Sequence, residues 1–520
     1  MNKEVIVGID LGTTNSCIAF MDGKEPTVLE NTEGNRITPS IVSFKENKTN
    51  RGTFETNVGD AAYRQKVSNA KRTVCSIKRD MGTDIHRLAD QPNPLNTYLP
   101  QEISAFILQY LKGFAQKKLG KPIRKAIITV PAYFNELQRN ATIQAAKIAG
   151  IDAQLLSEPV ASAIAYGLDQ KDKKQKILVY DLGGGTFDVS ILEIGDKDKD
   201  CKTIFKVLAT SGDAYLGGDD WDKRIIEWIE KKIKNDIPGW EPNAVALQQI
   251  TVAAEKAKKE LSSSIECDIS IPFLTFDPKT ASPYNFDANL TRTEFENMCK
   301  DLVERTEEPI KKALSQAQLT IADIDEILLV GGSTRMPAIQ DVVKKVTGRE
   351  PNRSINPDEV VAIGAAIKAG IMEEKISDIV LEDTTPLSLG VRSNGGKNTI
   401  IIPANTPIPC EKTVKASTSH DFQRNVKIVI LQGENIDDAT KNKELGQFTL
   451  SNIAAEKQGM PEIDITFKLD VNGILTVKAK DAQSGNEKAI IITNPCNLSD
   501  EEIIKLSKQH GLIKTNADKD

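Results

Sequence analysis

The chain has 520 residues, of which 39% are hydrophobic and 27% are charged, and its formal net charge is −6 at pH 7. This length exceeds one ordinary domain, so we expect two or more domains, each with its own hydrophobic core. The acidic balance and the lack of a basic patch interleaved with aromatic residues argue against a general nucleic-acid binder, and no apolar run is long enough to span a bilayer.

The start of the chain, Met-Asn-Lys-Glu, runs directly into a predicted strand without the layout of a signal peptide. The cysteines are scattered, without a C-x-x-C pair or a neighbouring histidine: Cys17, Cys75, Cys201, Cys267, Cys299, Cys410 and Cys496. Such a set is typical of reduced thiols and argues against a disulfide framework or a zinc site. We therefore expect a cytoplasmic protein, in which Cys17 is a small core residue rather than a redox-sensitive thiol.

The first predicted element is a strand, a glycine turn and a second strand within residues 5–20. Asp10 ends the first strand in the sequence Asp-Leu-Gly, and the hydroxyl residues Thr13 and Thr14 follow. A strand at residues 126–130 and an amphipathic helix over Gln138–Gly150 come next.

The sequence YDLGGGTFD, Tyr180–Asp188, repeats the first turn between two apolar runs. A single glycine cluster most often forms a plain turn. Here the pattern occurs twice, which puts Asp10 and Asp181 in equivalent places. The repetition predicts two related halves that face one ligand.

Predicted strands and helices continue to alternate up to about residue 375, which is typical of an α/β domain. The expected helices are Trp221–Ile233, Gln249–Leu261 and Glu294–Ala317. A third glycine turn, Leu329–Pro337, follows an apolar run, and its glycines would let the backbone lie against a flat base or a sugar.

After Pro386 the pattern changes to short strands separated by turn residues, which predicts a second, all-β domain. Ile463, Ile465, Phe467 and Leu469 alternate with polar residues, as in a sheet with one buried face. The expected strands are Asn398–Ile402, Lys412–Ser417, Val426–Leu431, Gln447–Leu450, Ile463–Leu469, Ile474–Lys480 and Ala489–Thr493.

The short segment from Asp378 to Pro386 joins the two domains and mixes apolar and acidic residues. At the other end of the β domain, Ser499 and Glu502 form a capping-box pattern, which predicts the start of a helix. A polar tail follows Gly511.

The glycine turns suit a nucleotide polyphosphate. Glycines let backbone N–H groups approach phosphate oxygens, and the hydroxyls of Thr13, Thr14 and Thr186 add donors. The carboxylates of Asp10 and Asp181 would repel phosphate alone, so they imply a hydrated Mg²⁺ between them. No segment matches the P-loop or the Rossmann fingerprint, so both of those solutions are disfavoured.

Taken together, these motifs resemble the seventy-kilodalton heat-shock chaperone family, from residue 3 to about residue 508. The most specific pieces occur in the family's order: Ile9–Ser16, Ile128–Asn135, Tyr180–Asp188, Leu216–Asp220, Val330–Pro337, Asn356–Glu359, Thr385–Gly390 and Leu431–Glu434. The resemblance implies an ATP-dependent chaperone of the stress response that binds extended apolar segments of unfolded polypeptides.

By this resemblance the chain has four parts: an actin-like α/β ATPase domain over residues 1–377, an interdomain linker over 378–385, a β-sandwich peptide-binding domain over 386–497, and the start of a helical lid with a polar tail over 498–520. ATP or ADP with Mg²⁺ would bind in the ATPase cleft, and K⁺ is a further candidate ion. Expected partners are unfolded clients, a J-domain co-chaperone and a nucleotide exchange factor, without nucleic acid or membrane.

The resemblance also assigns residues to the ATPase site. The catalytic set would be Asp10, Lys78, Glu158, Asp181 and Thr186, in which Lys78 orients the attacking water and both aspartates hold Mg²⁺ through water. Phosphoryl transfer needs mainly positioning and charge neutralisation, so a residue that holds one water in line suffices. The nucleotide contacts would be Gly12, Thr13, Thr14, Asn15, Gly183, Gly184, Gly185, Gly217, Gly218, Glu255, Lys258, Lys259, Ser262, Gly331, Gly332, Ser333, Arg335 and Asp358.

In the β domain the resemblance implies a peptide site that takes extended segments against strand edges. Its expected residues are Val391, Asn394, Ser419, Val426, Ile428 and Ile463, and those expected to couple it to the nucleotide are Pro131, Arg139, Leu381 and Asp383. The chain departs from the family pattern where Asn394 and Ser419 replace an apolar arch, where Ala416 replaces a phenylalanine, and where Glu382 enters the apolar linker. The helical lid is also nearly absent.

These departures keep a second function open, namely a weakly coupled holdase or a nucleotide-sensing regulator that retains peptide poorly. A sugar kinase or filament-forming relative is disfavoured, because neither needs a peptide-binding sandwich.

Overall fold

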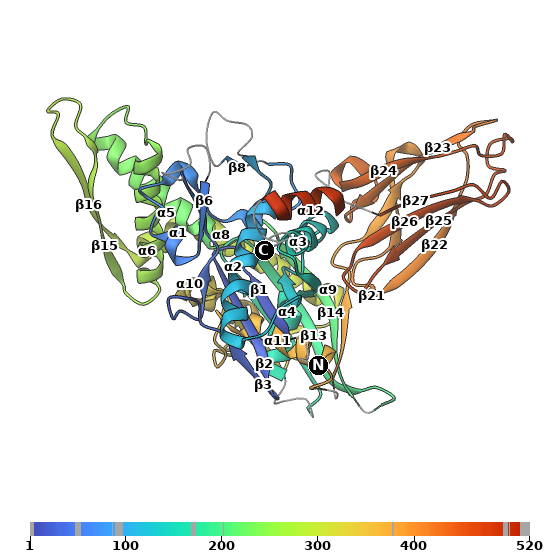
Figure 1. Cartoon of the computed structure of the whole chain (residues 1–520), viewed down its shortest axis with the longest axis horizontal. Helices are drawn as coiled ribbons and strands as arrows, with labels where there is room; N and C mark the ends of the chain where they lie inside the picture. The colour runs from blue at the N-terminus through green and yellow to red at the C-terminus, as the bar shows by residue number, and fades with distance from the viewer. Residues whose placement is uncertain are drawn as a thin grey trace, which may run out of the picture.

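The computed structural model of the chain describes residues 5–46, 54–85, 87–88, 97–167, 173–200, 202–376, 379–491, 498 and 500–509. Figure 1 shows a V-shaped molecule, in which the hairpin of β15 (Glu266–Phe276) and β16 (Pro283–Thr291) ends one arm and a β sandwich forms the other. None of the helices in these ranges is both long and apolar enough to cross a bilayer.

The first lobe of the α/β domain, lobe I, is built on a sheet with the strand order β11-β10-β1-β2-β3. β1 (Ile6–Leu11) lies antiparallel to β2 (Asn15–Asp22) and parallel to β10 (Lys125–Val130). The helix predicted at residues 138–150 is confirmed as α3 (Glu136–Ile148), which packs against α2 (Pro100–Leu119). The other elements of lobe I are β3 (Glu25–Val28), β4 (Thr38–Pro39), β5 (Val42–Glu46), β6 (Phe54–Val58), α1 (Asp60–Tyr63), η1 (Ala70–Arg72), β7 (Thr73–Val74), η2 (Ile77–Asp80), β8 (Arg87–Leu88), β9 (Thr97–Tyr98) and β11 (Asp152–Ser157).

Lobe II repeats this arrangement, which confirms the prediction of two related halves. β12 (Gln175–Leu182) is antiparallel to β13 (Phe187–Lys197) and parallel to β17 (Glu326–Val330). The sheet continues through β14 (Thr203–Asp213). Between the two sheets, α4 (Glu158–Gly167) and α11 (Val360–Met372) pack on each other, and one apolar cluster joins residues of both helices and both sheets.

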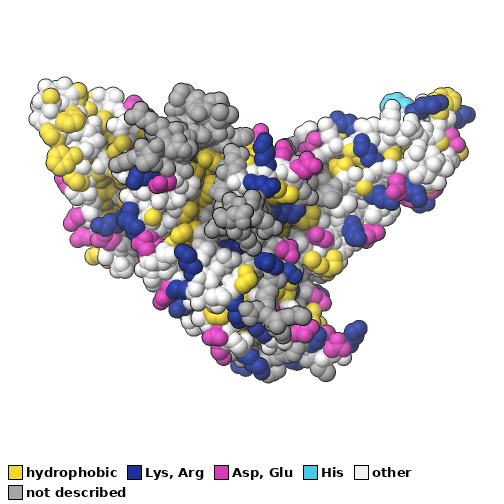
Figure 2. Space-filling view, viewed as in Figure 1, with side chains coloured by type: hydrophobic (Ala, Val, Ile, Leu, Met, Phe, Trp, Pro, Cys, Tyr) yellow, Lys and Arg dark blue, Asp and Glu magenta, His cyan; other side chains and the backbone are white. Residues whose placement is uncertain are grey.

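The upper part of lobe II consists of α5 (Gly218–Asp236), α6 (Ala244–Leu261) and the β15–β16 hairpin around a single core. Figure 2 shows hydrophobic side chains gathered at the end of this arm, and Ile265, Phe273 and Phe276 are exposed there. The remaining elements of lobe II are η4 (Ile321–Asp323), η5 (Gly332–Arg335) and α10 (Pro337–Thr347).

The prediction of a single helix over Glu294–Ala317 is wrong. The chain forms α7 (Arg292–Met298), α8 (Lys300–Arg305) and α9 (Glu307–Gln316) instead. Cys299, with φ of −106° and ψ of 7°, leaves the helical conformation, and both Cys299 and Thr306 are fixed in the core. Pro309 has no N–H to continue a long hydrogen-bond ladder, so the helix restarts before it.

The second domain is a sandwich of two facing sheets, ordered β20-β19-β23-β24 and β22-β25-β26-β27. The alternation predicted for Ile463–Leu469 is confirmed, because its apolar side chains are buried in the sandwich core. The strands and short helices are β19 (Leu389–Arg392), η6 (Asn394–Gly396), β20 (Asn398–Ile402), β22 (Cys410–Ala416), β23 (Asn425–Gln432), η7 (Ala439–Lys441), β24 (Lys443–Ser451), β25 (Ile463–Leu469), β26 (Leu475–Asp481) and β27 (Glu487–Ile491).

The segment predicted as a linker forms β18 (Ile379–Thr384), which extends the sheet of lobe II. It runs parallel to β14, and its last residues pair with β21 (Pro407–Ile408) of the β domain. One sheet therefore runs from lobe II into the joint between the domains. Asp378, at the predicted start of the linker, lies outside the described residues.

The predicted C-terminal helix is present as α12 (Asp500–Gln509), which packs on α3 of lobe I (Figure 1). Ile503 is buried in the lobe I core, and the Ser507 hydroxyl donates to the Ile148 carbonyl at 2.7 Å. The described part of the predicted lid thus lies against lobe I. The capping residue Ser499, the tail after Gly511, Cys201 and Cys496 lie outside the described residues.

Candidate functional site

A cavity of about 730 Å³ opens between the two lobes of the α/β domain. The cavity brings together residues from both aspartate turns, from η2, from α6 and from the turn after β17. Most of the predicted site residues line it: Asp10, Gly12, Thr13, Thr14, Asn15, Lys78, Glu158, Asp181, Gly183, Gly184, Thr186, Glu255, Lys258, Lys259, Ser262, Gly331, Gly332, Ser333, Arg335 and Asp358.

The two aspartate turns touch each other across the base of the cavity. A Cβ atom on Gly184 would lie 2.0 Å from the Thr14 hydroxyl oxygen, so only glycine permits this approach. Gly217 is equally confined, because its Cβ would lie 2.4 Å from the Gly185 nitrogen. Gly185, Gly217 and Gly218 contact the lining residues without lining the cavity themselves.

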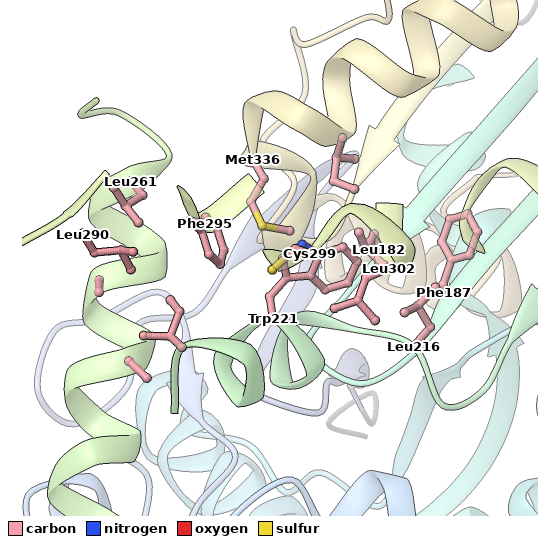
Figure 3. Close-up of a cluster of buried hydrophobic side chains, with 14 of the residues drawn as sticks. Leu182, Phe187, Leu216, Trp221, Leu261, Leu290, Phe295, Cys299, Leu302 and Met336 are labelled. Carbon is pink, nitrogen blue, oxygen red and sulfur yellow. The ribbon is translucent and has the colours of Figure 1, made fainter. Parts of the chain in front are cut away.

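Buried apolar side chains anchor these glycine turns. Leu182 and Phe187 flank the second aspartate turn, and Leu216 precedes Gly217. All three belong to the core shown in Figure 3, where they lie among Trp221, Cys299 and Leu302. The turns are therefore held by the packed interior of lobe II, and their backbone N–H groups are presented in a fixed arrangement.

Asp10 and Asp181 lie at the base of the cavity, where Asp181 is buried and Asp10 is partly buried. The Thr129 hydroxyl donates to Asp10 at 3.1 Å. Burial, followed by the charge of Glu158, raises the pKa of Asp10 to about 7, and burial also raises the pKa of Asp181 well above its usual value. Paired carboxylates with raised pKa values fit a divalent cation, whose charge would stabilise both ionised forms.

Lys78 and Glu158 face each other inside the cleft. The Lys78 Nζ atom donates to Glu158 at 2.5 Å, and both side chains are buried. Lys78 also lies over the Phe134 ring, with Nζ 5.9 Å from the ring centroid. The charges of Glu158 and Asp10 raise the pKa of Lys78 against the opposing effect of burial, which keeps the lysine cationic. The site thus holds one fixed positive charge beside its carboxylates.

The residues predicted to contact adenosine lie at the other end of the cavity, on one face of α6. Lys258 donates to Asp222 at 2.8 Å and to the Gly218 carbonyl at 3.1 Å, which ties α6 to a glycine turn. Glu255 bonds to Lys259 at 2.7 Å. Opposite them, Arg335 and Asp358 form an ion pair of 2.6 Å.

Sequence reasoning missed several lining residues, among them Tyr63, Lys66, Cys75, Asp219 and Asp222. Asp219 and Asp222 could have been found, because they follow the Gly217–Gly218 turn at the start of a helix. Lys66 carries no local signal. It reaches the site only because lobe I brings it to Glu255, at 3.6 Å.

The predicted peptide-site residues are only partly accessible. Ile428, Ile463 and Val391 belong to the sandwich core, and Ile463 is fully buried. The alternation of β25 directs the Ile463 side chain into the sandwich core. Val426 is partly exposed at the start of β23.

The two polar residues predicted to replace the apolar arch lie in loops. Asn394 begins the exposed turn η6, and Ser419 bonds within its own loop, its N–H donating to the Gln423 side chain at 2.9 Å.

Of the residues predicted for coupling, Arg139 lies close to Gly473 of the β domain, and Asp383 belongs to the strand that pairs with β21. Pro131 and Arg139 are buried at the end of lobe I, and Leu381 packs against the cluster between the lobes. Burial raises the pKa of Asp383, while the charge of Arg139 acts against that rise. Further contacts that cross the interface were not predicted: Leu155 N–H donates to Asn472 at 3.2 Å, and Thr210 N–H donates to Asn405 at 3.2 Å.

Comparisons with known proteins agree with the resemblance found in the sequence motifs. A family model described as Hsp70 protein matches residues 6–520. A "Chaperone protein DnaK" of Ureaplasma urealyticum is 49% identical over 523 residues, which cover 100% of this chain and 83% of that protein. The protein of the same name in Mycoplasmopsis pulmonis is 50% identical over 512 residues, covering 98% of this chain and 82% of that protein. That of Ureaplasma parvum serovar 3 is 48% identical over 523 residues, covering 100% and 83%.

Proposed function

The chain belongs to the Hsp70 family and is an ATP-dependent chaperone with ATPase activity, and we propose that it hydrolyses ATP in the cavity between the lobes to control a peptide site in the β sandwich. The observation that carries the proposal is the convergence of both aspartate turns, Lys78 and Glu158 on one cavity. The residue assignments below are part of the same proposal.

In this mechanism the glycine turns hold the β- and γ-phosphates through backbone N–H groups. Lys78 holds one water in line with the γ-phosphorus, and Glu158 holds Lys78 in place. The water oxygen bonds to phosphorus as the bond to the β–γ bridging oxygen breaks, which gives ADP and phosphate. Thr186, beside Gly185, adds a hydroxyl donor near the γ-phosphate.

Hsp70 proteins in general bind ATP or ADP with Mg²⁺. In this chain Asp10 and Asp181 would hold the ion through water, and it would neutralise charge on the phosphate oxygens. K⁺ as a further ion is also proposed, on the same acidic lining. The nucleoside would lie between α6, with Glu255, Lys258 and Ser262, and the turn that carries Arg335.

Unfolded polypeptides are the general partners of such a chaperone, and we propose the more specific ones. A nucleotide exchange factor would act on the exposed apolar residues of the β15–β16 arm, because this arm shares a core with α6 and moving it would open the cavity. A J-domain co-chaperone and a cytoplasmic location remain predictions from the sequence.

One observation supports a second function, a holdase that retains peptide weakly. Asn394 and Ser419, the residues expected to arch over a peptide, are polar and lie in loops of the sandwich. Burying one leucine in the pocket contributes roughly 1.5–3 kcal/mol, which alone is small against the cost of ordering a peptide. Fast peptide release is therefore expected even with ADP.

ATP turnover, measured with and without an unfolded apolar peptide, separates these functions. A coupled chaperone increases its turnover on peptide addition, whereas a holdase binds peptide without that increase. Val426→Phe should block binding of a fluorescent peptide and leave basal turnover unchanged, and Asn394→Met with Ser419→Ala should slow its release. Unchanged peptide binding by Val426→Phe would exclude the proposed pocket.

A further inference from the structure

Glu136, the first residue of α3, lies in the contact between the ATPase domain and the β sandwich. Its N–H donates to the Gln432 side-chain oxygen at 3.3 Å, and the two residues are 2% and 1% exposed. The next residue, Leu137, packs into the core of the sandwich. The Glu136 carboxyl therefore loses its water only while the two domains are in contact.

Few hydrogen bonds replace the water that the Glu136 carboxyl loses on burial. The Glu136 Oε2 atom is buried without a hydrogen-bond partner among the described residues, and the same holds for Gln432 Nε2. A buried carboxylate in that position keeps its charge only at a large desolvation cost.

The charged groups around Glu136 come from several elements. Arg139 of α3 is the cation that favours its ionised form, and Asp470, in the turn between β25 and β26, opposes it. The charge of Arg139 also lowers the pKa values of Asp383 of β18 and Asp188 of β13. One guanidinium therefore stabilises the ionised forms of three carboxyl groups. The backbone of Leu475 in β26 adds a hydrogen bond.

We propose that Glu136 is a proton-binding site that links docking of the β sandwich on the ATPase domain to pH. Burial, followed by the charge of Asp470, raises the pKa of Glu136 to about 8, against Arg139 and the Leu475 amide. When the domains separate, Gln432, Asp470 and Leu475 leave, and the carboxyl returns to its ordinary pKa near 4.5. Docking therefore takes up a proton at neutral pH.

The direction of the pH dependence of docking follows from the difference between the docked and separated pKa values of Glu136. Between about pH 5 and pH 7.5 the docked form holds a proton that the separated form lacks, so the docking constant falls about tenfold for each unit that pH rises. Above about pH 8 both forms are ionised, and the constant levels off. This proposal rests on the proposed function in one respect, namely that the two domains dock and separate. Docking is measured independently of ATP turnover and of peptide binding.

The test uses the full chain with ATP and Mg²⁺, and small-angle X-ray scattering gives the docked fraction between pH 5.5 and 9. Asn472→Ala removes the hydrogen bond to Leu155 and brings both forms into the measurable range. If that chain stays fully docked, Asn405→Gly, which suits the φ of 60° at this position, removes the bond to Thr210 as well.

In this background we expect the tenfold fall per pH unit, and Glu136→Gln should abolish it while the matched exposed variant Glu308→Gln keeps it. Asp470→Asn should move the level region to lower pH, because it removes the repelling charge. A docked fraction that is independent of pH with Glu136 present, or an equal slope in Glu136→Gln, would overturn the proposal.

Discussion

Lys78 and Glu158 form an ion pair inside the cavity between the lobes, at the place where the proposed hydrolysis would occur. They are 80 residues apart in sequence and meet at 2.5 Å in a buried pair. A buried pair of this kind is costly to break, because the remaining partner keeps an uncompensated charge. In the proposed mechanism, Glu158 fixes the position of Lys78 and so prepares the lysine to hold the attacking water.

Lys78→Ala should reduce ATP turnover by about 10²–10³-fold, since the fixed cation acts on the transition state. ATP affinity should stay within about tenfold, because the phosphates are held mainly by the glycine turns. Single-turnover hydrolysis and isothermal titration measure the two effects separately, with the exposed Lys117→Ala as the control. Equal losses in binding and turnover would contradict the role of Lys78.

Asp10 predicts a pH dependence for Mg²⁺-dependent binding. Because burial raises its pKa to about 7, the metal-binding carboxylate is the minor form at pH 6 and the major form at pH 8. Affinity for ATP with Mg²⁺ should therefore rise about tenfold between these pH values. Isothermal titration with and without Mg²⁺ tests this, and Asp10→Asn should abolish both the Mg²⁺ effect and the rise. An Asp10→Asn chain that still gains affinity from Mg²⁺ would argue against the metal assignment.

The segment between the two domains is the strand β18, which pairs with β14 and β21, and not a free linker. As a strand paired with β14, it directs alternate side chains to opposite faces. Leu381 packs into the cluster between the lobes, and Glu382 lies on the other face. The charge of Glu382, which the sequence placed among docking apolar residues, is thus kept apart from the Leu381 contact.

Leu381→Asp should detach β18, because it buries an unpaired charge in an apolar cluster, and weaken docking of the strand by at least about tenfold. Turnover should then no longer respond to an unfolded peptide, while the basal rate persists. Glu382→Gln is the matched control and should keep the response. ATPase rates with and without peptide decide, and a normal response in Leu381→Asp would show that β18 does not carry the coupling.

At the scale of the whole molecule, the cavity is closed by contacts between its lobes. Lys66 of lobe I lies 3.6 Å from Glu255 on α6 of lobe II, and both side chains are mostly buried. Since α6 also carries the proposed adenosine contacts, opening this ion pair would free the path by which nucleotide leaves. We infer that the pair acts as a latch, that is, an ion pair that holds the two sides of the cleft together.

Lys66→Met should speed ADP release by about fivefold, which corresponds to the loss of about 1 kcal/mol from the closed form. Stopped-flow release of a fluorescent ADP analogue measures the rate. Lys256→Met, an exposed lysine on the same helix, serves as the control. If both variants release ADP at the normal rate, the latch does not limit release.

The two aspartate turns, the α/β and all-β halves, and most residues that line the cavity were predictable from the sequence. These features are local, because glycine, hydroxyl and carboxylate types within a few residues of one another specify a turn and its chemistry. The alternation of Ile463–Leu469 was also predictable, and it directs the Ile463 side chain into the sandwich core.

Contacts between residues far apart in the sequence were not predictable, because they depend on how the whole chain packs. Glu136 and Gln432 are 296 residues apart, Lys66 and Glu255 lie in different lobes, and no periodicity relates either pair. The division of the predicted Glu294–Ala317 helix, the strand β18 and the position of α12 on α3 have the same origin. In each case burial against a partner from elsewhere in the chain outweighed local preference, and that free energy is not encoded in any short window of sequence.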